Sequence, residues 1–258
     1  MQTPIVQNIY EMIDQIAPFE TQAEFDNAGF LIGDRNQPVE RILLCLDVVP
    51  AVIREAKENN VDLIVSHHPV MFNGTKSLTT DNFENSIILE LIRHNISLIS
   101  AHTNLDQSVI SPSNCTAELL GLQNVEPIDQ YMVMGEYNEG MNASDFLNHI
   151  SEKLNFLGIL YGRADKLVKK IAVGSGGYSE GIHSALHSEA DALITGEVKH
   201  HHALEATAKD LVIFEAGHLP SEYPALPVLA DYLRNTAKEW SFNVEILVSK
   251  VDTYDKIP

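Results

Sequence analysis

Three segments of the chain place histidines beside carboxylates, or beside another histidine, where an apolar strand is expected to end. In the first, Ser66–Pro69, His67 and His68 directly follow an apolar run. Adjacent histidines on a continuing strand would point to opposite faces, but Pro69 stops the strand and the turn lets both rings converge. Neutral imidazole is a common ligand of divalent metal ions. On its own, this segment fits metal binding and a hydrogen-bonded loop equally well.

The second segment, Ser100–Asp106, also follows a predicted strand and carries several polar side chains in close succession. They are His102, Thr103, Asn104 and Asp106. A metal site is one interpretation. For this segment taken alone, a turn or a helix N-cap supplied by Thr103, Asn104 or Asp106 is the simpler one.

In the third segment, Glu215–Glu222, a histidine and a carboxylate lie on either side of a strand-to-helix junction. His218 and Glu222 are four positions apart, and a metal ion could be gripped there. The structural alternative is that Ser221 caps the helix, Glu222 complements its dipole, and His218 is an ordinary loop residue.

A fourth segment, Thr195–His202, contains Glu197 and a run of three histidines. Consecutive residues on a helix are separated by about 100°, so His200, His201 and His202 cannot all face one ion. Glu197, at a predicted strand end, is the better candidate. We expect His201 to be the histidine that reaches a site beside Glu197, and at least one of the others to be solvated.

Together these segments offer imidazoles and carboxylates, with no cysteine among them. This donor set suits divalent ions such as Zn, Mn, Fe or Co. Carboxylates can bridge two ions ~3.5–4 Å apart, and such a pair can deprotonate a shared water near neutral pH. The resulting nucleophile could attack a phosphoryl group, a carbonyl or a ring carbon.

Other catalytic schemes have less support in the sequence. The chain contains no phosphate-binding motif of the G-x-x-x-x-G-K-[ST] type. Gly174–Gly177 follows a predicted strand but fits neither the dinucleotide fingerprint nor the nucleophile elbow. We predict a tight strand–helix turn there, although its amides could also contact an anion. Cys45 lies in an apolar run and is expected to be a buried small hydrophobe.

Alternating strands and helices are expected to position these segments. A helix is predicted over residues 3–17, with Thr3 as N-cap and Pro4 in its first turn. Apolar runs predict strands at about 42–48, 61–66, 96–101, 171–174, 191–195 and 211–215. Helical patterns lie near 50–59, 84–94, 113–121, 180–189, 199–209 and 228–239. This alternation predicts parallel sheets flanked by helices.

An internal repeat relates the two halves of the chain. When Ile42 is aligned with Ile171, the following residues run in register without a gap, so that Asp62 matches Asp191. His68 then matches Glu197, and a shorter connection aligns His102 with His218. Because ligand sites in open α/β sheets lie outside the carboxyl ends of strands, two facing halves would bring both sets of residues to one cleft.

Composition limits the possible partners and compartment. Of 258 residues, 17 are basic and 36 acidic, giving a formal charge of −19. Such a surface disfavours nucleic acid and anionic lipid. No apolar run approaches the ~18 residues of a membrane span, and the N-terminus lacks the features of a signal peptide. With two cysteines, a cytoplasmic protein is expected.

Five motifs occur in order along nearly the whole chain, and as a set they are specific. They are Asp26–Gly29, Ser66–Pro69, Ser100–Asp106, Thr195–Glu197 and Gly217–Glu222. This set resembles the Nif-three-like family, whose members are commonly named GTP cyclohydrolase type two homologues. The resemblance implies two related, interlinked α/β domains with mainly parallel sheets. We expect the first at 1–124, completed by 226–258, and the second at 125–225.

The family resemblance also implies a dinuclear metal centre and an assembly. Two divalent ions per chain (Zn, Fe, Mn, Co or Ni) are expected in a toroidal homo-hexamer whose metal sites face an internal cavity. The implied ligands are His67, His68, Asp106, His218 and Glu222.

The function implied by the resemblance is metal-dependent hydrolysis of a nucleotide or related small molecule, with attack at C8 of GTP and release of formate. His102 or Glu197 could transfer protons in such a reaction. A phosphohydrolase and a non-catalytic metal-binding or regulatory hexamer remain alternatives, as do purely structural histidines. The chain departs from the family at Phe25, where Trp is common, and Pro224 and Pro227 leave the course of the following helix undecided.

Overall fold

In the computed structural model, which describes residues 2–251, the chain divides into two units. The first unit comprises the described residues up to Ser108 and those from Leu226 onward, and the second is Val109–Ala225. The sequence placed this division at residue 124. The structure places it earlier because α5 (Pro112–Leu119) packs on strands of the second unit.

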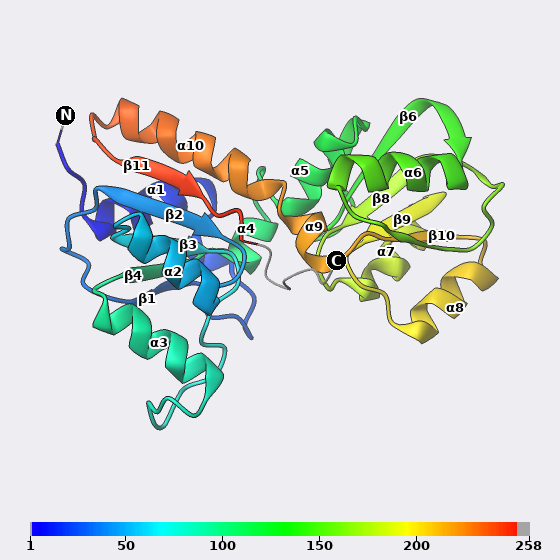
Figure 1. Ribbon diagram of the computed structural model, residues 1–258. Coiled ribbons are helices and arrows are strands. Elements are labelled where there is room, and N and C mark those ends of the chain that lie inside the picture. Colours follow the sequence, from blue (N-terminus) through cyan, green and yellow to red (C-terminus); the bar gives the residue numbers. More distant parts are fainter. Residues whose placement is uncertain (1, 252–258) are drawn as a thin grey trace. The chain divides into compact units, whose positions relative to one another are not determined.

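The sheet of the first unit has the strand order β1-β4-β3-β2-β11 (Figure 1). Its central strands are parallel, and β1 runs antiparallel to β4 at one edge. Every residue of β3 and β4 is buried, as expected for strands covered on both faces. The strands are β1 (Gly29–Ile32), β2 (Arg41–Cys45), β3 (Leu63–Ser66), β4 (Ser97–Ser100) and β11 (Glu245–Val248).

Helices cover both faces of this sheet. One face, formed by residues such as Leu43, Ile64 and Leu98, packs against α2 and α3. On the other side α1 and α10 lie together, and Tyr232 Oη of α10 donates to the Met12 carbonyl of α1. The helical segments are α1 (Val6–Ile16), η1 (Phe19–Thr21), α2 (Pro50–Glu58), α3 (Phe83–Arg93), α4 (Thr103–Asp106) and α10 (Ala225–Glu239).

Two details of these helices differ from or complete the sequence prediction. The predicted start of α1 at Thr3 and Pro4 is wrong, and the N-cap is Ile5. The Pro4 carbonyl accepts a hydrogen bond from the Val39 amide, which ties Pro4 to the segment around Val39 instead of to the helix. The segment containing Pro224 and Pro227 forms two helices, since α9 ends before Pro224 and α10 begins after it.

The sheet of the second unit has the order β5-β6-β8-β9-β10-β7. Strands β8, β9 and β10 are parallel, and antiparallel strands flank them on both sides. The strands are β5 (Gln123–Pro127), β6 (Val133–Asn142), β7 (Ile159–Tyr161), β8 (Leu167–Gly174), β9 (Ala192–Thr195) and β10 (Val212–Glu215).

Alternate residues of the parallel strands enter two separate cores. Val173, Ile194 and Phe214 pack with α5 and α6 (Ala143–Leu154) on one face. Ala172, Leu193 and Ile213 pack on the other face with α7 (Ile182–His187) and α8 (His200–Ala208). The remaining helical segments are η2 (Ser179–Gly181) and α9 (His218–Glu222).

The two parallel cores have the same strand register. In the first unit Leu63 pairs with Ile42 and with Ser97. In the second, Ala192 pairs with Ile171 and with Val212. These are the pairs that the internal alignment requires, and the predicted fold class of two related, interlinked α/β units is confirmed.

Equivalent turns carry equivalent hydrogen bonds. The Asp62 carboxylate accepts from the amides of Glu40 and Arg41, and the Asp191 carboxylate accepts from those of Lys169 and Lys170. These aspartates precede β3 and β9, so each ties the start of its strand to that of its parallel neighbour.

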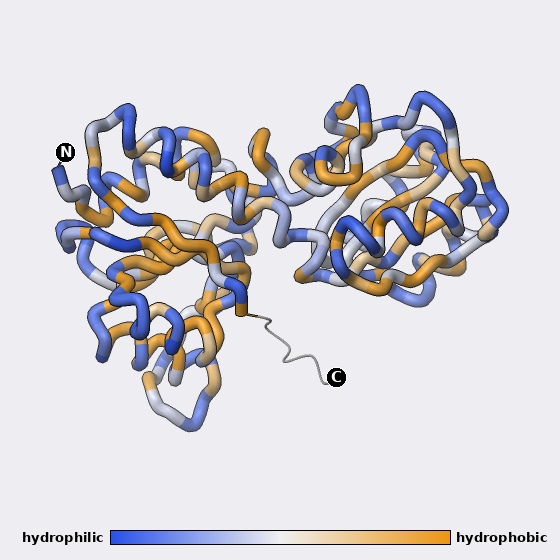
Figure 2. Tube along the Cα trace, turned by 45° about the horizontal axis from the view of Figure 1, so that its top comes forward, coloured by the Kyte–Doolittle hydropathy of each residue, from blue (hydrophilic) through white to orange (hydrophobic). Residues whose placement is uncertain are grey.

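Hydropathy along the chain agrees with this arrangement. Figure 2 shows hydrophobic segments running through the interior of each unit and hydrophilic segments along helices and loops. Among residues 2–251 we find no helix with the length and apolar character needed to cross a membrane.

Candidate metal centre

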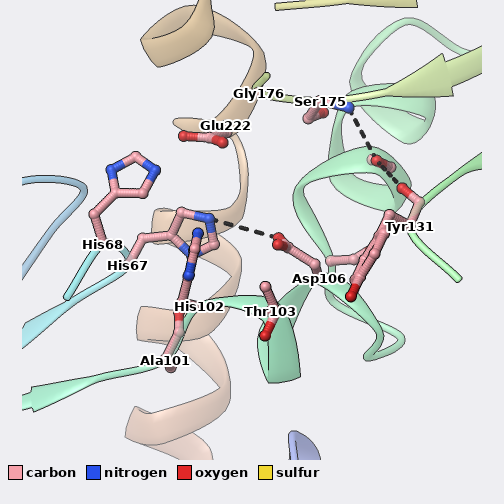
Figure 3. Close-up of polar contacts among 12 residues, drawn as sticks. His67, His68, Ala101, His102, Thr103, Asp106, Tyr131, Ser175, Gly176 and Glu222 are labelled. Carbon is pink, nitrogen blue, oxygen red and sulfur yellow. Dashed lines mark hydrogen bonds and ion pairs between the residues drawn. The ribbon is translucent and has the colours of Figure 1, made fainter. Parts of the chain in front are cut away.

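The first unit gathers three histidines at the carboxyl ends of β3 and β4. His67 and His68 follow β3, and His102 follows β4. These strands are parallel neighbours, and the hydroxyls of their last residues, Ser66 and Ser100, are 2.8 Å apart. The ring centroids of the three histidines, here called the histidine cluster, lie 4.9, 5.2 and 5.4 Å apart in pairs. Figure 3 shows these side chains pointing toward one another.

Each ring of the histidine cluster is held through its Nδ1 atom. His67 Nδ1 donates to the Ala101 carbonyl at 2.8 Å. His68 Nδ1 is 2.9 Å from an Asp47 carboxylate oxygen, and His102 Nδ1 is 2.9 Å from one of Asp26. Carbonyl and carboxylate oxygens accept hydrogen bonds, so these contacts favour the tautomer with its lone pair on Nε2. Histidine ligands of metals are oriented in this way.

Asp26, the partner of His102, has a strongly lowered pKa. Its side chain is fully buried. Burial raises the pKa of Asp26, but hydrogen bonds from His102 and from the hydroxyl and amide of Thr103 outweigh it and hold the pKa well below its usual range. Asp26 is therefore a carboxylate at neutral pH and a fixed acceptor for His102.

Asp106 lies at the end of α4, beside the histidine cluster. Its Oδ1 is 3.5 Å from His67 Nε2, the contact marked by a dashed line in Figure 3. The N-cap of α4 is His102, without a side-chain capping hydrogen bond, so the prediction of a helix N-cap at Thr103, Asn104 or Asp106 is wrong; Asn104 Oδ1 instead accepts from the His102 amide within this turn. His67, His68 and His102 each offer a ligand atom within 4.8 Å of the others, a group that could hold a metal ion.

The second unit carries a separate imidazole–carboxylate pair at the carboxyl end of β10. His218 and Glu222 begin and end α9, and His218 Nε2 is 3.2 Å from Glu222 Oε1. His218 Nδ1 is 2.9 Å from Glu197 Oε1, so Glu197 orients this ring as Asp47 orients His68. Glu222 is buried, whereas the Glu197 side chain is 60% exposed.

The Gly174–Gly177 turn makes room for this pair. Gly176 has φ of +67°, and a Cβ added there would lie 2.1 Å from Glu222 Oε1. The amides of Ser175 and Gly176 donate to the hydroxyls of Ser113 and Ser221. This segment is therefore the predicted tight turn, and those two amides are used within the protein. Ser221 donates to the His218 carbonyl instead of capping a helix.

The histidine run of the fourth segment does not behave as expected. His202, and not His201, is the ring that turns inward: it is 7% exposed, and its Nδ1 is 3.1 Å from the Ser179 hydroxyl. His200 and His201 are exposed at the start of α8. The reason is the helical turn itself, which places the third residue of the run over η2.

The two units show related positions with different chemistry. His102 and Asp106 bracket the first helical turn after β4, and His218 and Glu222 bracket the one after β10. This equivalence extends the alignment of His102 with His218. The sequence interpretation missed Asp47, although its position just after β2 was the available signal.

With this geometry in view, the comparisons with known proteins are decisive for the family. A family model described as Duf34/NIF3 (NGG1p interacting factor 3) matches residues 4–255. The chain belongs to this family. The resemblance inferred from the five motifs is thereby confirmed.

Relatives in the family match over nearly their whole length. A GTP cyclohydrolase 1 type 2 homolog of Clostridium perfringens is 32% identical over 252 residues, covering 94% of this chain and 95% of the relative. A homolog of the same name from Campylobacter jejuni is 36% identical over 231 residues, covering 88% and 91%. The crystal structure of a hypothetical protein of Staphylococcus aureus superposes with a TM-score of 0.94 at 27% identity, over 100% of this chain and 99% of that one.

Proposed function

We propose that the chain is a metal-dependent hydrolase that opens the imidazole ring of a purine nucleotide. Two divalent ions, of Zn, Fe, Mn, Co or Ni, would be held by His67, His68, Asp106, His218 and Glu222. The observation that carries the proposal is that His67, His68 and His218 are each anchored through Nδ1, which leaves their Nε2 lone pairs available to a metal ion. The name GTP cyclohydrolase 1 type 2 homolog, carried by relatives of the chain, supports the substrate class.

The donor set agrees with such ions. Neutral imidazole and carboxylate are ligands of borderline divalent metals, and both described cysteines are buried, with their thiol pKa raised by burial. When bound, a pair of such ions would lower the pKa of a water and polarise the substrate. The protein residues then have to orient the metal ligands, position the purine base of the substrate and move protons.

Proton transfer is assigned to His102 in this proposal, and ligand positioning to Glu197. The Glu197 carboxylate binds His218 Nδ1, which occupies it in holding that ring. His102 lies within the histidine cluster and is backed by the buried Asp26 carboxylate. In the proposed reaction water adds to C8 and the C8–N9 bond breaks, with a proton delivered to N9. A second water then hydrolyses the formamide and releases formate.

The experiment that tests this function supplies metal-replete protein with GTP and measures formate and the ring-opened purine. We expect both products, and their loss in Asp106→Asn together with loss of bound metal. Cleavage of phosphate esters without formate would replace the cyclohydrolase proposal with a phosphohydrolase. Loss of metal in Asp106→Asn with no turnover of any substrate in the parent protein would favour a non-catalytic metal-binding role.

A homo-hexamer is part of the same proposal, and its support is the family resemblance. Light scattering of the purified protein tests it, and a monomer or dimer at micromolar concentration would contradict it. The cytoplasmic location stays a prediction from the sequence.

A further inference from the structure

Two exposed phenylalanines lie beside the His102–Asp26 contact. Phe72 is 44% exposed, and its ring meets that of His102 edge-to-face, with centroids 5.7 Å apart. Phe25 is 69% exposed and immediately precedes Asp26. Isolated exposed apolar side chains are common on protein surfaces. Phe72 differs in that it has an aromatic partner in the candidate site, the His102 ring.

The backbone before Phe72 is held by the same segment that orients His102. Asn27 Nδ2 donates to the Met71 carbonyl at 2.6 Å, and the neighbouring Asp26 carboxylate binds His102. The Asn27 amide in turn donates to Asp26. The Asn27 side chain therefore holds the backbone next to Phe72, while Phe72 itself stays exposed and is not a core residue.

The charge of the protein also favours recognition of a ring. With 36 acidic and 17 basic residues, the surface gives a nucleoside triphosphate no general attraction. Affinity then has to come from bound metal and from the base. An exposed aromatic face next to the reacting groups is suited to binding the base, because every nucleobase offers a π-face on which an aromatic ring can stack.

We propose that Phe72 is the platform on which the purine base of the substrate stacks. The proposal rests on the function proposed above and names the feature of the substrate that the protein selects, a planar heteroaromatic ring. It makes Phe72 a specificity-determining residue: compounds that carry phosphates but no ring do not use it.

Binding is measured with metal-replete protein and three probes: GTP, guanosine and inorganic triphosphate. We expect Phe72→Ala to raise the Kd of GTP and guanosine about 5- to 150-fold, the range of one lost stacking contact. The Kd of inorganic triphosphate and the metal content should not change. The matched control is Phe83→Ala, which removes a 62% exposed ring at the start of α3, and it should leave all three constants unchanged.

A fluorescent reporter gives an independent measurement. The chain contains one tryptophan, so Trp240→Phe combined with Phe72→Trp leaves a single indole at the proposed platform. Quenching of this indole by guanosine, and its absence with inorganic triphosphate, would support the proposal.

Several outcomes would overturn the platform and leave the proposed function standing, or the reverse. Equal Kd values for Phe72→Ala and the parent, in a protein that turns over GTP, would remove the platform alone. Ring-dependent binding without formate production would keep the platform and remove the hydrolase. A change of oligomeric state in Phe72→Ala with unaltered guanosine binding would show that Phe72 packs against a second copy of the chain, which contradicts the proposal.

Discussion

The β2–β3–β4 core of the first unit and the β8–β9–β10 core of the second are built alike but carry different chemistry at their carboxyl ends. Their registers agree, and Asp62 and Asp191 make the same pair of amide contacts. Yet where β3 is followed by His67 and His68, the equivalent positions after β9 are Gly196 and Glu197. The backbone frame is shared, and the donors at its end have diverged.

The two units therefore contribute different kinds of donor atom to the proposed ligand set. The first unit presents mainly imidazole nitrogen, and the second presents a buried carboxylate with one imidazole. The position after the first strand of each core shows the divergence most clearly. It is Asp47 in the first unit, which orients His68, and Gly176 in the second, which leaves space for Glu222. Asp47 supports a proposed ligand by a direct contact, whereas Gly176 does so by having no side chain that would collide with Glu222.

The largest effect is expected from filling that space. Gly176→Ala would place a methyl group against Glu222 Oε1 on backbone of positive φ, so the carboxylate must move. We expect metal affinity to fall ~100-fold or more, since a ligand and not merely its support is displaced. The control is Gly177→Ala, whose added Cβ would meet His218 Cε1 only at 3.6 Å. Isothermal titration with Zn²⁺ measures both, and equal affinities for the two variants would contradict the role given to Gly176.

A smaller effect is expected from the orienting carboxylates. Asp47→Asn and Glu197→Gln each replace a pure acceptor on a histidine Nδ1, and loss of such partners typically costs ~10- to 100-fold in metal affinity. The Asp47 variant should lose more, because its side chain is 36% exposed against 60% for Glu197. The same titration ranks them, and a reversed order would mean that burial does not set the strength of these contacts.

The smallest effect concerns stability. Asp26→Asn removes a charged acceptor, and we expect the free energy of unfolding at pH 7 to fall by about 1.5 kcal/mol. Because the folded pKa of Asp26 is lowered, the stabilisation is complete above the unfolded value of about 3.9 and is lost as the pH falls through the folded value. In urea unfolding, the free energies of unfolding of parent and variant should therefore differ less at pH 3 than at pH 7. A constant difference would assign the effect to packing.

The sequence predicted the parallel cores well because their strands are uninterrupted apolar runs. It did not predict β5, β6 or β7, since these strands carry many exposed residues and lack that signal. The start of α1 was wrong because Pro4 is a favourable first helical residue only when its neighbours are not paired elsewhere, and the Val39 amide takes its carbonyl.

The candidate site was only partly predictable for a similar reason. Strand ends and the repeat located His67, His68, His102 and His218, but ring orientation depends on partners far away in the chain. Asp47 and Asp26 reach their histidines across the folded sheet, and no spacing in the sequence records that. The role of Gly176 is likewise visible only as the space that a side chain would occupy.

The insertion of the second unit within the first has a consequence for how the protein is made. Strand β2 cannot pair with its neighbour β11 until β11 has been synthesised, about 200 residues later. At ~5–20 residues per second, this takes roughly 10–40 s. The second unit, Val109–Ala225, is one uninterrupted stretch, and its synthesis is finished before that of β11. During that interval β2 has an open edge, a known hazard for misassembly. The inserted unit is therefore complete in sequence while the sheet of the first unit still lacks its last strand.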